Sequence, residues 1–298
     1  MGDISINYRK SNDMYGEYEP QVLERLHNVE LSMLKDFMKL CDDNNIEYFA
    51  ISGTAIGTVR HQGFIPWDDD IDIALLRKDY ERFVKAMRKN KEFCEKYELW
   101  GPDQPHKYYN LQPTLMLKNT VFVNENAYAG GYRPGILMDI FIYDNIPEDK
   151  KKADLIIKKC RRYKILYIVR NVNHFKLLKG KEPVQKIKNL ICGFLRIALR
   201  LLPKSDEILF RRFMMYATMY KEQSDKYTCL FDPGSAIMDI HKSRSYPTIK
   251  LPFEDTEIRL VKNYDEQLRQ HMGEYMKVPP VEKRTNHCPI ELDFGDNV

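Results

Sequence analysis

Apolar residues in the first half of the chain follow two different periods, one typical of helices and the other of strands. Between residues 21 and 44 they recur every three or four positions, which predicts an amphipathic helix. Residues 46–51 form a short apolar run that predicts a strand, and the glycine that follows predicts a turn into a short helix ending near Arg60. The same patterns predict further strands over residues 71–75, 111–117, 121–123 and 136–143, and a charged helix over residues 79–89.

The order of these elements, a helix followed by strands that alternate with helices, predicts an α+β fold with a small mixed sheet and flanking helices. The sequence changes character near Pro147. Residues 148–222 are basic and apolar with helical spacing, which predicts a second, helical lobe. Short strands over 248–251 and 257–261 and a helix over 263–276 then predict a return to the core. The predicted parts are an N-terminal arm (1–20), a core (21–147), a helical lobe (148–245) and a C-terminal part that packs back on the core (246–298).

Within the helical lobe, residues 187–202 combine Ile, Leu and Phe with Lys188, Arg196 and Arg200. This stretch is too short and too charged to span a bilayer. We favour a core helix of the second lobe, because helices rich in leucine and isoleucine usually pack inside. The alternative is an interfacial helix that lies on anionic lipid.

Composition narrows the class of protein. The chain has 298 residues, enough for two lobes, and its net charge of +4 suits an acidic ligand or an anionic surface but is too weak to indicate nucleic acid. The six cysteines are scattered without a CxxC pair, which favours free thiols. The N-terminus is polar and shows no signal peptide. We therefore expect a cytoplasmic protein, with peripheral contact at the inner face of the membrane as an option.

The main candidate site lies in the segment Gly53–Ala74, where two carboxylates occupy a predicted strand. Asp70 and Asp72 point to the same side of that strand, because alternate residues share a face. Adjacent carboxylates repel each other, and the usual reason to hold them together is a divalent cation. Asp139 lies in another apolar strand, and antiparallel pairing would bring it alongside. We expect these three to hold one or two Mg²⁺ ions, with Mn²⁺ as an alternative. The competing interpretation makes Asp68–Asp72 a solvated loop with a weak calcium site.

The residues ahead of the acidic strand suit the binding of phosphate. Gly53 and Thr54 form a turn at which the backbone can approach an anion. We place Gly57 at a helix start, whose N–H groups favour negative charge. Arg60 and His61 add positive charge and hydrogen bonds to phosphate. Taken alone, this glycine pattern is a weak signal, and its value comes from its position just before the carboxylates.

Three blocks of the sequence closely resemble the LicD family of phosphocholine and related phosphotransferases, a group that also includes the fukutin-related proteins. The first block is Gly53–Ile73, the second is Met138–Phe141, and the third consists of short motifs between Leu251 and His287. The resemblance extends over nearly the whole chain. It implies a nucleotidyltransferase-like fold, a donor activated by cytidine diphosphate, and Mg²⁺.

The resemblance also implies roles for single residues. Asp70 and Asp72 correspond to metal ligands, and Asp139 to the third acidic position, either a ligand or a base. Gly53 and Thr54 correspond to the phosphate-binding turn. The helical lobe has no motif that matches the family, so the acceptor stays open.

These assignments lead to a mechanism for a phosphotransferase. We expect a CDP-activated alcohol, first of all CDP-choline, to lie over Asp70 and Asp72. A hydroxyl of a cell-surface glycan, lipopolysaccharide or teichoic acid precursor, free or lipid-linked, would attack the distal phosphorus and release CMP. The metal, Arg60 and His61 would neutralise the diphosphate. Asp139 would orient a metal or accept the hydroxyl proton. Choline, ethanolamine, glycerol and ribitol phosphates all remain open.

Residues outside the acidic segment complete the predicted site. Trp67 either stacks on a base and covers the site or packs as an ordinary core residue. Asp265 and His287 are expected to close the site from the C-terminal side, with helix capping as the alternative for Asp265. A choline head group needs an aromatic cage, for which the candidates are Tyr128, Tyr132, Tyr264 and Tyr275.

Two other functions use the same residues. A nucleotidyltransferase would attack the α-phosphorus of a nucleoside triphosphate and release pyrophosphate, and its acidic trio would look the same. A membrane-associated scaffold would use the acidic loop to bind Ca²⁺ and would ignore nucleotides.

Overall fold

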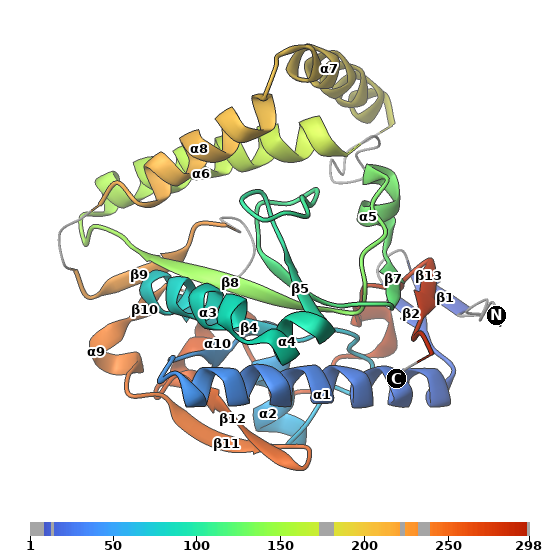
Figure 1. The fold of residues 1–298 in the computed structure, drawn as a ribbon, viewed down its shortest axis with the longest axis vertical. Helices are drawn as coiled ribbons and strands as arrows, with labels where there is room; N and C mark the ends of the chain where they lie inside the picture. Colours follow the sequence, from blue (N-terminus) through green and yellow to red (C-terminus); the bar gives the residue numbers. More distant parts are fainter. Residues whose placement is uncertain (1–8, 13–14, 173–181, 221–223, 232–238, 297–298) are drawn as a thin grey trace.

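The computed structural model describes residues 9–12, 15–172, 182–220, 224–231 and 239–296. These residues form a mixed sheet with helices packed against it, and three helices form a lobe on one side (Figure 1). The predicted combination of helices and a mixed sheet is confirmed. One large apolar core joins the sheet, the helices on it and the inner side of the helical lobe.

Helix α1 (Pro20–Asp43) confirms the amphipathic helix predicted from the spacing of apolar residues. Proline begins the helix, where its missing N–H costs no hydrogen bond. Leu26 and Phe37 on its inner side are fully buried and belong to the main core. Helix α3 (Arg77–Lys89) packs beside α1 and against the sheet.

The main sheet has seven strands among the described residues, and its centre carries the candidate site. They are β10 (Ile240–His241), β9 (Lys226–Cys229), β8 (Leu137–Asn145), β4 (Asp72–Leu76) and β3 (Phe49–Ala50) in that order, with β6 (Thr114–Leu117) on β8 and β5 (Tyr97–Trp100) on β6. The neighbours β4 and β8 run parallel, which corrects the antiparallel pairing expected from the sequence. The parallel register still pairs Asp72 with Asp139. The residues that follow Asp72 in β4 are buried, as expected for a central strand.

The predicted helical lobe consists of α6 (Lys150–Asn171), α7 (Glu182–Leu201) and α8 (Ser205–Ala217). Strand β9 pairs with β8 and β10 pairs with β9, so both strands belong to the main sheet, which corrects the assignment of residues 148–245 as a whole to the lobe. Two short helices, α4 (Lys91–Lys96) and α5 (Glu125–Gly130), have no counterpart in the predicted elements.

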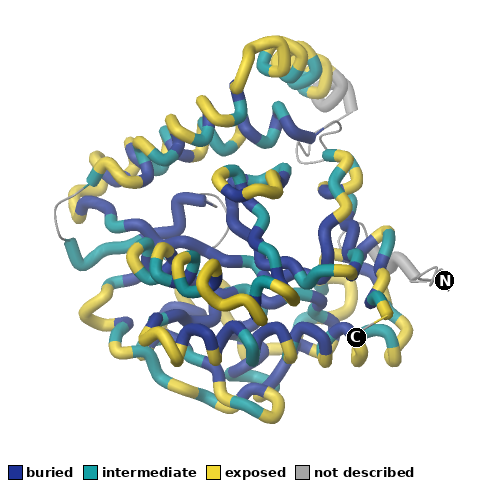
Figure 2. The backbone as a smooth tube through the Cα atoms, viewed as in Figure 1, coloured by how far each residue is buried: buried dark blue, intermediate teal, exposed yellow. Residues whose placement is uncertain are grey.

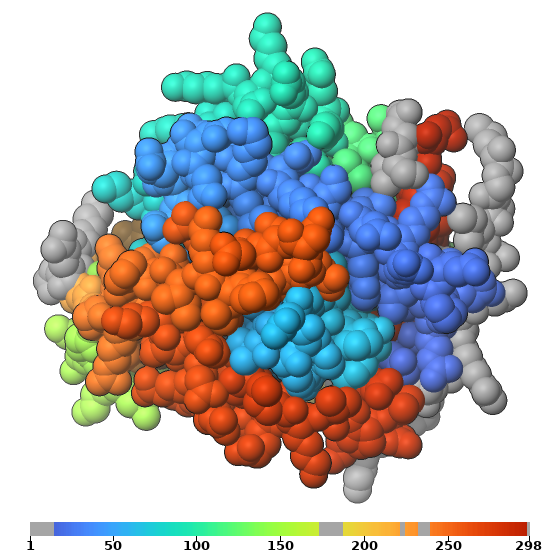
Figure 3. All heavy atoms as spheres, turned by 90° about the horizontal axis from the view of Figure 1, so that it is seen from below, coloured from blue at the N-terminus to red at the C-terminus, as the bar shows by residue number. Residues whose placement is uncertain are grey.

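The C-terminal part packs back on the core through several short elements. Figure 3 shows the β11–β12 hairpin, helix α2 and the C-terminal segment on one face of the molecule. Strand β13 pairs with β7, and the N-terminal strands β1 and β2 form a hairpin where the sequence predicts an arm. The bounds are β1 (Arg9–Asn12), β2 (Tyr15–Glu17), α2 (Ser52–His61), β7 (Val121–Val123), α9 (Lys242–Ser245), β11 (Ile249–Phe253), β12 (Thr256–Leu260), α10 (Tyr264–Met272), η1 (Val281–Lys283) and β13 (Glu291–Asp293).

Burial is uneven over the molecule. The sheet and the inner side of α1 are buried, whereas α7 at the far end of the helical lobe is mostly exposed (Figure 2). The prediction that residues 187–202 form a core helix is therefore wrong, because the apolar side chains Ile187, Phe194 and Ile197 are each at least 60% exposed. Within the described ranges, no helix is both long enough and apolar enough to cross a membrane.

Candidate active site

Three aspartates at the start of β4 line one wall of a cavity of about 760 Å³. They are Asp68, Asp70 and Asp72, and their alternate spacing in an extended segment puts them on one side of the chain. Asp139 pairs with Asp72 across β4 and β8, and paired residues on neighbouring strands project to the same face of a sheet. Its carboxylate accepts a hydrogen bond from Thr114 Oγ1 at 2.8 Å. The structure thus brings the predicted acidic trio to one face and adds Asp68.

The electrostatics of this wall are unfavourable for a protein without a bound cation. Burial raises the pKa of Asp72 well above its usual value, and the charges of Asp70 and Asp139 raise it further. Burial and the charge of Asp70 act in the same way on the pKa of Asp68. A cation relieves such repulsion, and carboxylate oxygens are the ligands that Mg²⁺ prefers. The residues present therefore fit a divalent cation of this kind.

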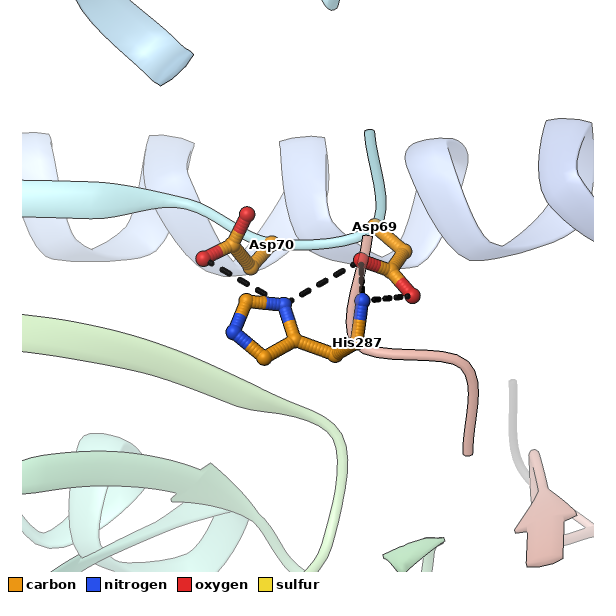
Figure 4. A group of neighbouring side chains, drawn as sticks. All are labelled: Asp69, Asp70 and His287. Carbon is orange, nitrogen blue, oxygen red and sulfur yellow. Dashed lines mark hydrogen bonds and ion pairs between the residues drawn. The ribbon is translucent and has the colours of Figure 1, made fainter. Parts of the chain in front are cut away.

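Asp69 has a different role from its neighbours. Its side chain has no exposed area and accepts hydrogen bonds from the Tyr18 hydroxyl at 2.5 Å and from the backbone N–H of Cys288 at 3.1 Å. It also accepts one from the backbone N–H of His287 at 2.7 Å (Figure 4). Burial alone would raise the pKa of Asp69, but the side-chain hydrogen bond and the charge of His287, together with the hydrogen bonds from Tyr18 and the His287 backbone, hold this pKa below its usual value. Asp69 thus anchors both the N-terminal and the C-terminal segments to the acidic loop, an arrangement that we call the Asp69 anchor.

His287 lies where the Asp69 anchor meets the cavity. Its Nδ1 is 3.2 Å from Asp69 and 3.7 Å from Asp70, and Figure 4 shows the other ring nitrogen directed away from both. Burial lowers the pKa of His287, but the charge of Asp70 and the hydrogen bond with Asp69 outweigh this effect and raise the pKa well above its usual value. Ligand atoms of these three residues lie within 4.8 Å of one another. Since four groups already hydrogen-bond to Asp69, namely the Tyr18 hydroxyl, the His287 ring and the backbone N–H groups of His287 and Cys288, we treat it as a positioning residue.

Helix α2 holds the acidic strand in place. The hydroxyl of Thr54 accepts a hydrogen bond at 2.8 Å from the backbone N–H of Asp72, which ties the first turn of α2 to the strand. A Cβ added to Gly53 would lie 2.3 Å from the Asp68 carboxylate, which explains why a glycine stands there. Both residues lie in the first turn of α2, and Gly53 lines the cavity.

The role expected for Gly57 is wrong. Helix α2 begins at Ser52, so Gly57 lies in mid-helix, where its N–H serves the helix ladder. A Cβ at Gly57 would come within 2.4 Å of the carbonyl oxygen of Gly63. The glycine therefore permits close packing of the helix on the loop that leads to the acidic strand.

Four cationic side chains line the same cavity: Arg60, Lys277, Lys283 and Arg284. Arg60 is held by a hydrogen bond from Nη1 to the carbonyl oxygen of Tyr275 at 2.7 Å. Acidic and cationic groups in one cavity match a ligand that carries phosphate and a metal ion together.

His61 and Trp67 contact two of these cationic side chains. His61 accepts a hydrogen bond from Arg60 Nε at 2.9 Å and lies edge-on to the Trp67 ring. The guanidinium of Arg284 lies 4.1 Å from the centre of the Trp67 ring, a cation–π contact. Trp67 is 9% exposed and packs in a small apolar cluster, as the core alternative expects, and it also contributes to the cavity wall. Its stacking on a base stays a prediction.

Asp265 contacts a residue that lines the cavity. It lies in the first turn of α10, where it accepts hydrogen bonds from the Tyr275 hydroxyl at 2.7 Å and from Arg269 Nε at 3.0 Å. These bonds lower the pKa of Asp265. Tyr275 in turn lines the cavity, so Asp265 reaches the site through it.

Of the four tyrosines proposed for an aromatic cage, Tyr275 lies at the cavity. Tyr128 is 70% exposed, and Tyr132 packs against the rings of Tyr108 and Tyr109. The cage is thus not assembled by the residues predicted for it.

Several site residues were not predicted from the sequence. The two-residue period that identified Asp70 and Asp72 extends to Asp68, so this residue could have been found. Lys277, Lys283 and Arg284 reach the cavity through long-range folding of the C-terminal segment, for which local sequence carries no signal.

Comparisons with known proteins find sequences similar to this chain. Residues 45–126 match the family model of the LicD/FKTN/FKRP nucleotidyltransferase domain, which covers α2 and β4. The chain is 29% identical over 276 residues to the lipopolysaccharide cholinephosphotransferase LicD of Haemophilus influenzae, covering 87% of this chain and 93% of that protein. The chain is also 43% identical over 60 residues to an uncharacterized protein of Rickettsia typhi, and this shorter match covers 20% of this chain and 19% of that protein. Residues 45–126 therefore carry the domain of the LicD/FKTN/FKRP family, and the resemblance to LicD that the motifs predict is confirmed.

Proposed function

We propose that this protein is a phosphotransferase that moves phosphocholine from CDP-choline to a hydroxyl of a cell-surface glycan and releases CMP. The observation that carries the proposal is the cavity, which is lined both by carboxylates and by cationic side chains of the C-terminal segment. A nucleoside diphosphate donor needs both, because its phosphates bind a metal on one side and Lys or Arg on the other. The likeness to the Haemophilus cholinephosphotransferase supports the choice of head group.

Asp70, Asp72 and Asp139 are the residues that would hold Mg²⁺ or Mn²⁺. When bound, the ion would neutralise charge on the diphosphate and orient it. Asp68 lies close enough to Asp70 to share a hydrogen bond with it, and so supports the same wall.

The other side chains bind and position the donor. Arg60, Lys283 and Arg284 would neutralise the phosphate oxygens as the bond to the leaving CMP breaks. Asp139, beside Asp72 and hydrogen-bonded to Thr114, would accept the proton of the attacking hydroxyl if it is not occupied as a ligand.

A thermal-shift panel tests the proposal. CDP-choline, CDP-ethanolamine, CDP-glycerol and CDP-ribitol are each added with Mg²⁺, and the true donor should raise Tm by mass action. Incubation with an acceptor glycan should then release CMP. Pyrophosphate released from CTP instead would identify a nucleotidyltransferase, and a shift with Ca²⁺ but with none of the nucleotides would identify a scaffold.

A further inference from the structure

At the far end of the helical lobe, large apolar side chains are exposed to solvent instead of buried. Ile187, Leu190, Phe194 and Leu201 on α7 are each at least 60% exposed. Their spacing of three, four or seven residues puts them on one side of the helix. Apolar side chains scattered singly over a surface are normal, but a continuous stripe marks a contact surface. We call the exposed apolar side of α7 over residues 187–201 the α7 stripe.

Cations accompany the α7 stripe. Helical spacing puts Lys188 and Arg200 on its two flanks, and the exposed Lys204 follows the end of the helix. Helix α6, which packs against α7, holds nine Lys and Arg residues and one acidic residue. An apolar stripe bordered by Lys and Arg is typical of helices that lie in the interface of a bilayer.

We propose that the α7 stripe docks on the surface of an anionic lipid bilayer, with its apolar side chains in the boundary between headgroups and acyl chains. Charge complementarity favours this occupant over a second copy of the chain. A two-fold interface would place the same patch on both sides, so the basic α6–α7 surface of one copy would face that of the other. Lipid headgroups of negative charge would instead neutralise it.

Flotation of the full chain with vesicles tests the docking. The protein should float with vesicles of phosphatidylcholine and phosphatidylglycerol and remain below vesicles of phosphatidylcholine alone. The double variant Phe194→Ser/Ile197→Ser should lower partition about 100-fold, because two apolar side chains no longer leave water. Ile290→Ser, which removes an exposed side chain of the same type from the C-terminal segment, should float like the wild type.

Three outcomes would overturn the proposal: no flotation of the wild type, equal flotation with both vesicle types, or an unchanged double variant. Dimers in sedimentation that the double variant abolishes would assign the α7 stripe to a second copy. The double variant should keep its circular dichroism spectrum and its thermal shift with CDP-choline. If the double variant loses flotation but keeps its thermal shift with CDP-choline, the docking on lipid is separate from the proposed transfer activity.

Discussion

The cavity and the α7 stripe break the usual pattern of burial in opposite directions. At the cavity, carboxylates such as Asp68 and Asp72 are withdrawn from water and raise one another's pKa. On α7, apolar side chains such as Phe194 stand in water. Each arrangement costs stability in the isolated chain, because buried charge and exposed apolar area are both unfavourable.

The difference between the two regions lies in what would relieve the cost. A cation with a phosphate ligand would compensate the charge at the cavity, and an apolar surface would cover the α7 stripe. The Arg77–Asp144 salt bridge shows the contrast, because it is buried but its two charges compensate each other within the protein and have good geometry. Places where local rules fail are therefore the places to search for function.

The largest effect is expected at the acidic wall. Asp70→Asn keeps the shape of the side chain but removes a charge, and should lower the rate of CMP release at least about 1,000-fold, a loss typical of an essential charged group. Its Tm should stay the same or rise, because one repulsive charge is gone. Asp255→Asn, at an exposed residue on the β11–β12 turn, is the matched control and should retain activity. Near-normal turnover by the Asp70→Asn enzyme would show that the cavity does not take part in the mechanism.

Substitutions in the Asp69 anchor should lower the stability of the fold, whereas Asp70→Asn should leave it unchanged or raise it. Asp69→Asn replaces one acceptor oxygen by an amide that faces backbone N–H donors, and should lower the free energy of unfolding by about 2–4 kcal/mol. Urea denaturation measures the change. Tyr18→Phe removes one hydrogen bond to the same carboxylate and should cost about 1 kcal/mol. Equal stability of Asp69→Asn and the wild type would show that the anchor does not hold the C-terminal segment.

The fold was predictable where the pattern is local. Helices α1 and α3 and strand β8 follow from the period of their apolar residues. Strand β9 was missed because its place in the sheet depends on pairing with β8, which lies far away in the sequence. The six residues of α4 are too few to show a helical period.

The candidate site was predictable to the same degree. Asp70 and Asp72 stand out by their two-residue spacing, and Asp139 stands out as a carboxylate in the middle of an apolar strand. Gly57 was misjudged because a glycine needed for close packing looks the same in a sequence as one needed at an anion. The exposure of α7 could not be predicted, because a leucine-rich helix has the same pattern whether its apolar side meets a core or another surface.

The charges around the α7 stripe should contribute less than its apolar side chains. Lys188→Gln and Lys204→Gln should each weaken binding to anionic vesicles about fivefold, as expected for about 1 kcal/mol per cation near the surface. Added salt should weaken wild-type binding and reduce the difference between wild type and variants. Lys262→Gln makes the same change on an exposed residue after β12 and should have no effect. Equal losses for all three variants would mean that total charge, and not the α7 surface, controls binding.

The smallest effect concerns the pH dependence of His287 in metal-free protein. The pKa of His287 in the folded state lies above its unfolded value of about 6.5. Protonation therefore stabilises the fold, and this contribution is fully present below pH of about 6.5 and is lost as the pH rises through the raised folded-state pKa. Since the ring is 44% exposed, solvent screening should keep the contribution below about 1 kcal/mol.

Urea denaturation of the wild type and His287→Gln with a chelator present measures this contribution. The stability advantage of the wild type should shrink as the pH rises. His271→Gln provides a control of opposite sign, because burial lowers the pKa of His271, so its protonation opposes folding and the wild type should gain on that variant as the pH rises. If the wild type instead gained on His287→Gln toward alkaline pH, the ring would be neutral in the folded protein. The aspartates would then lack their counter-charge, and the cost of the acidic wall would be larger than the contrast with the α7 stripe assumes.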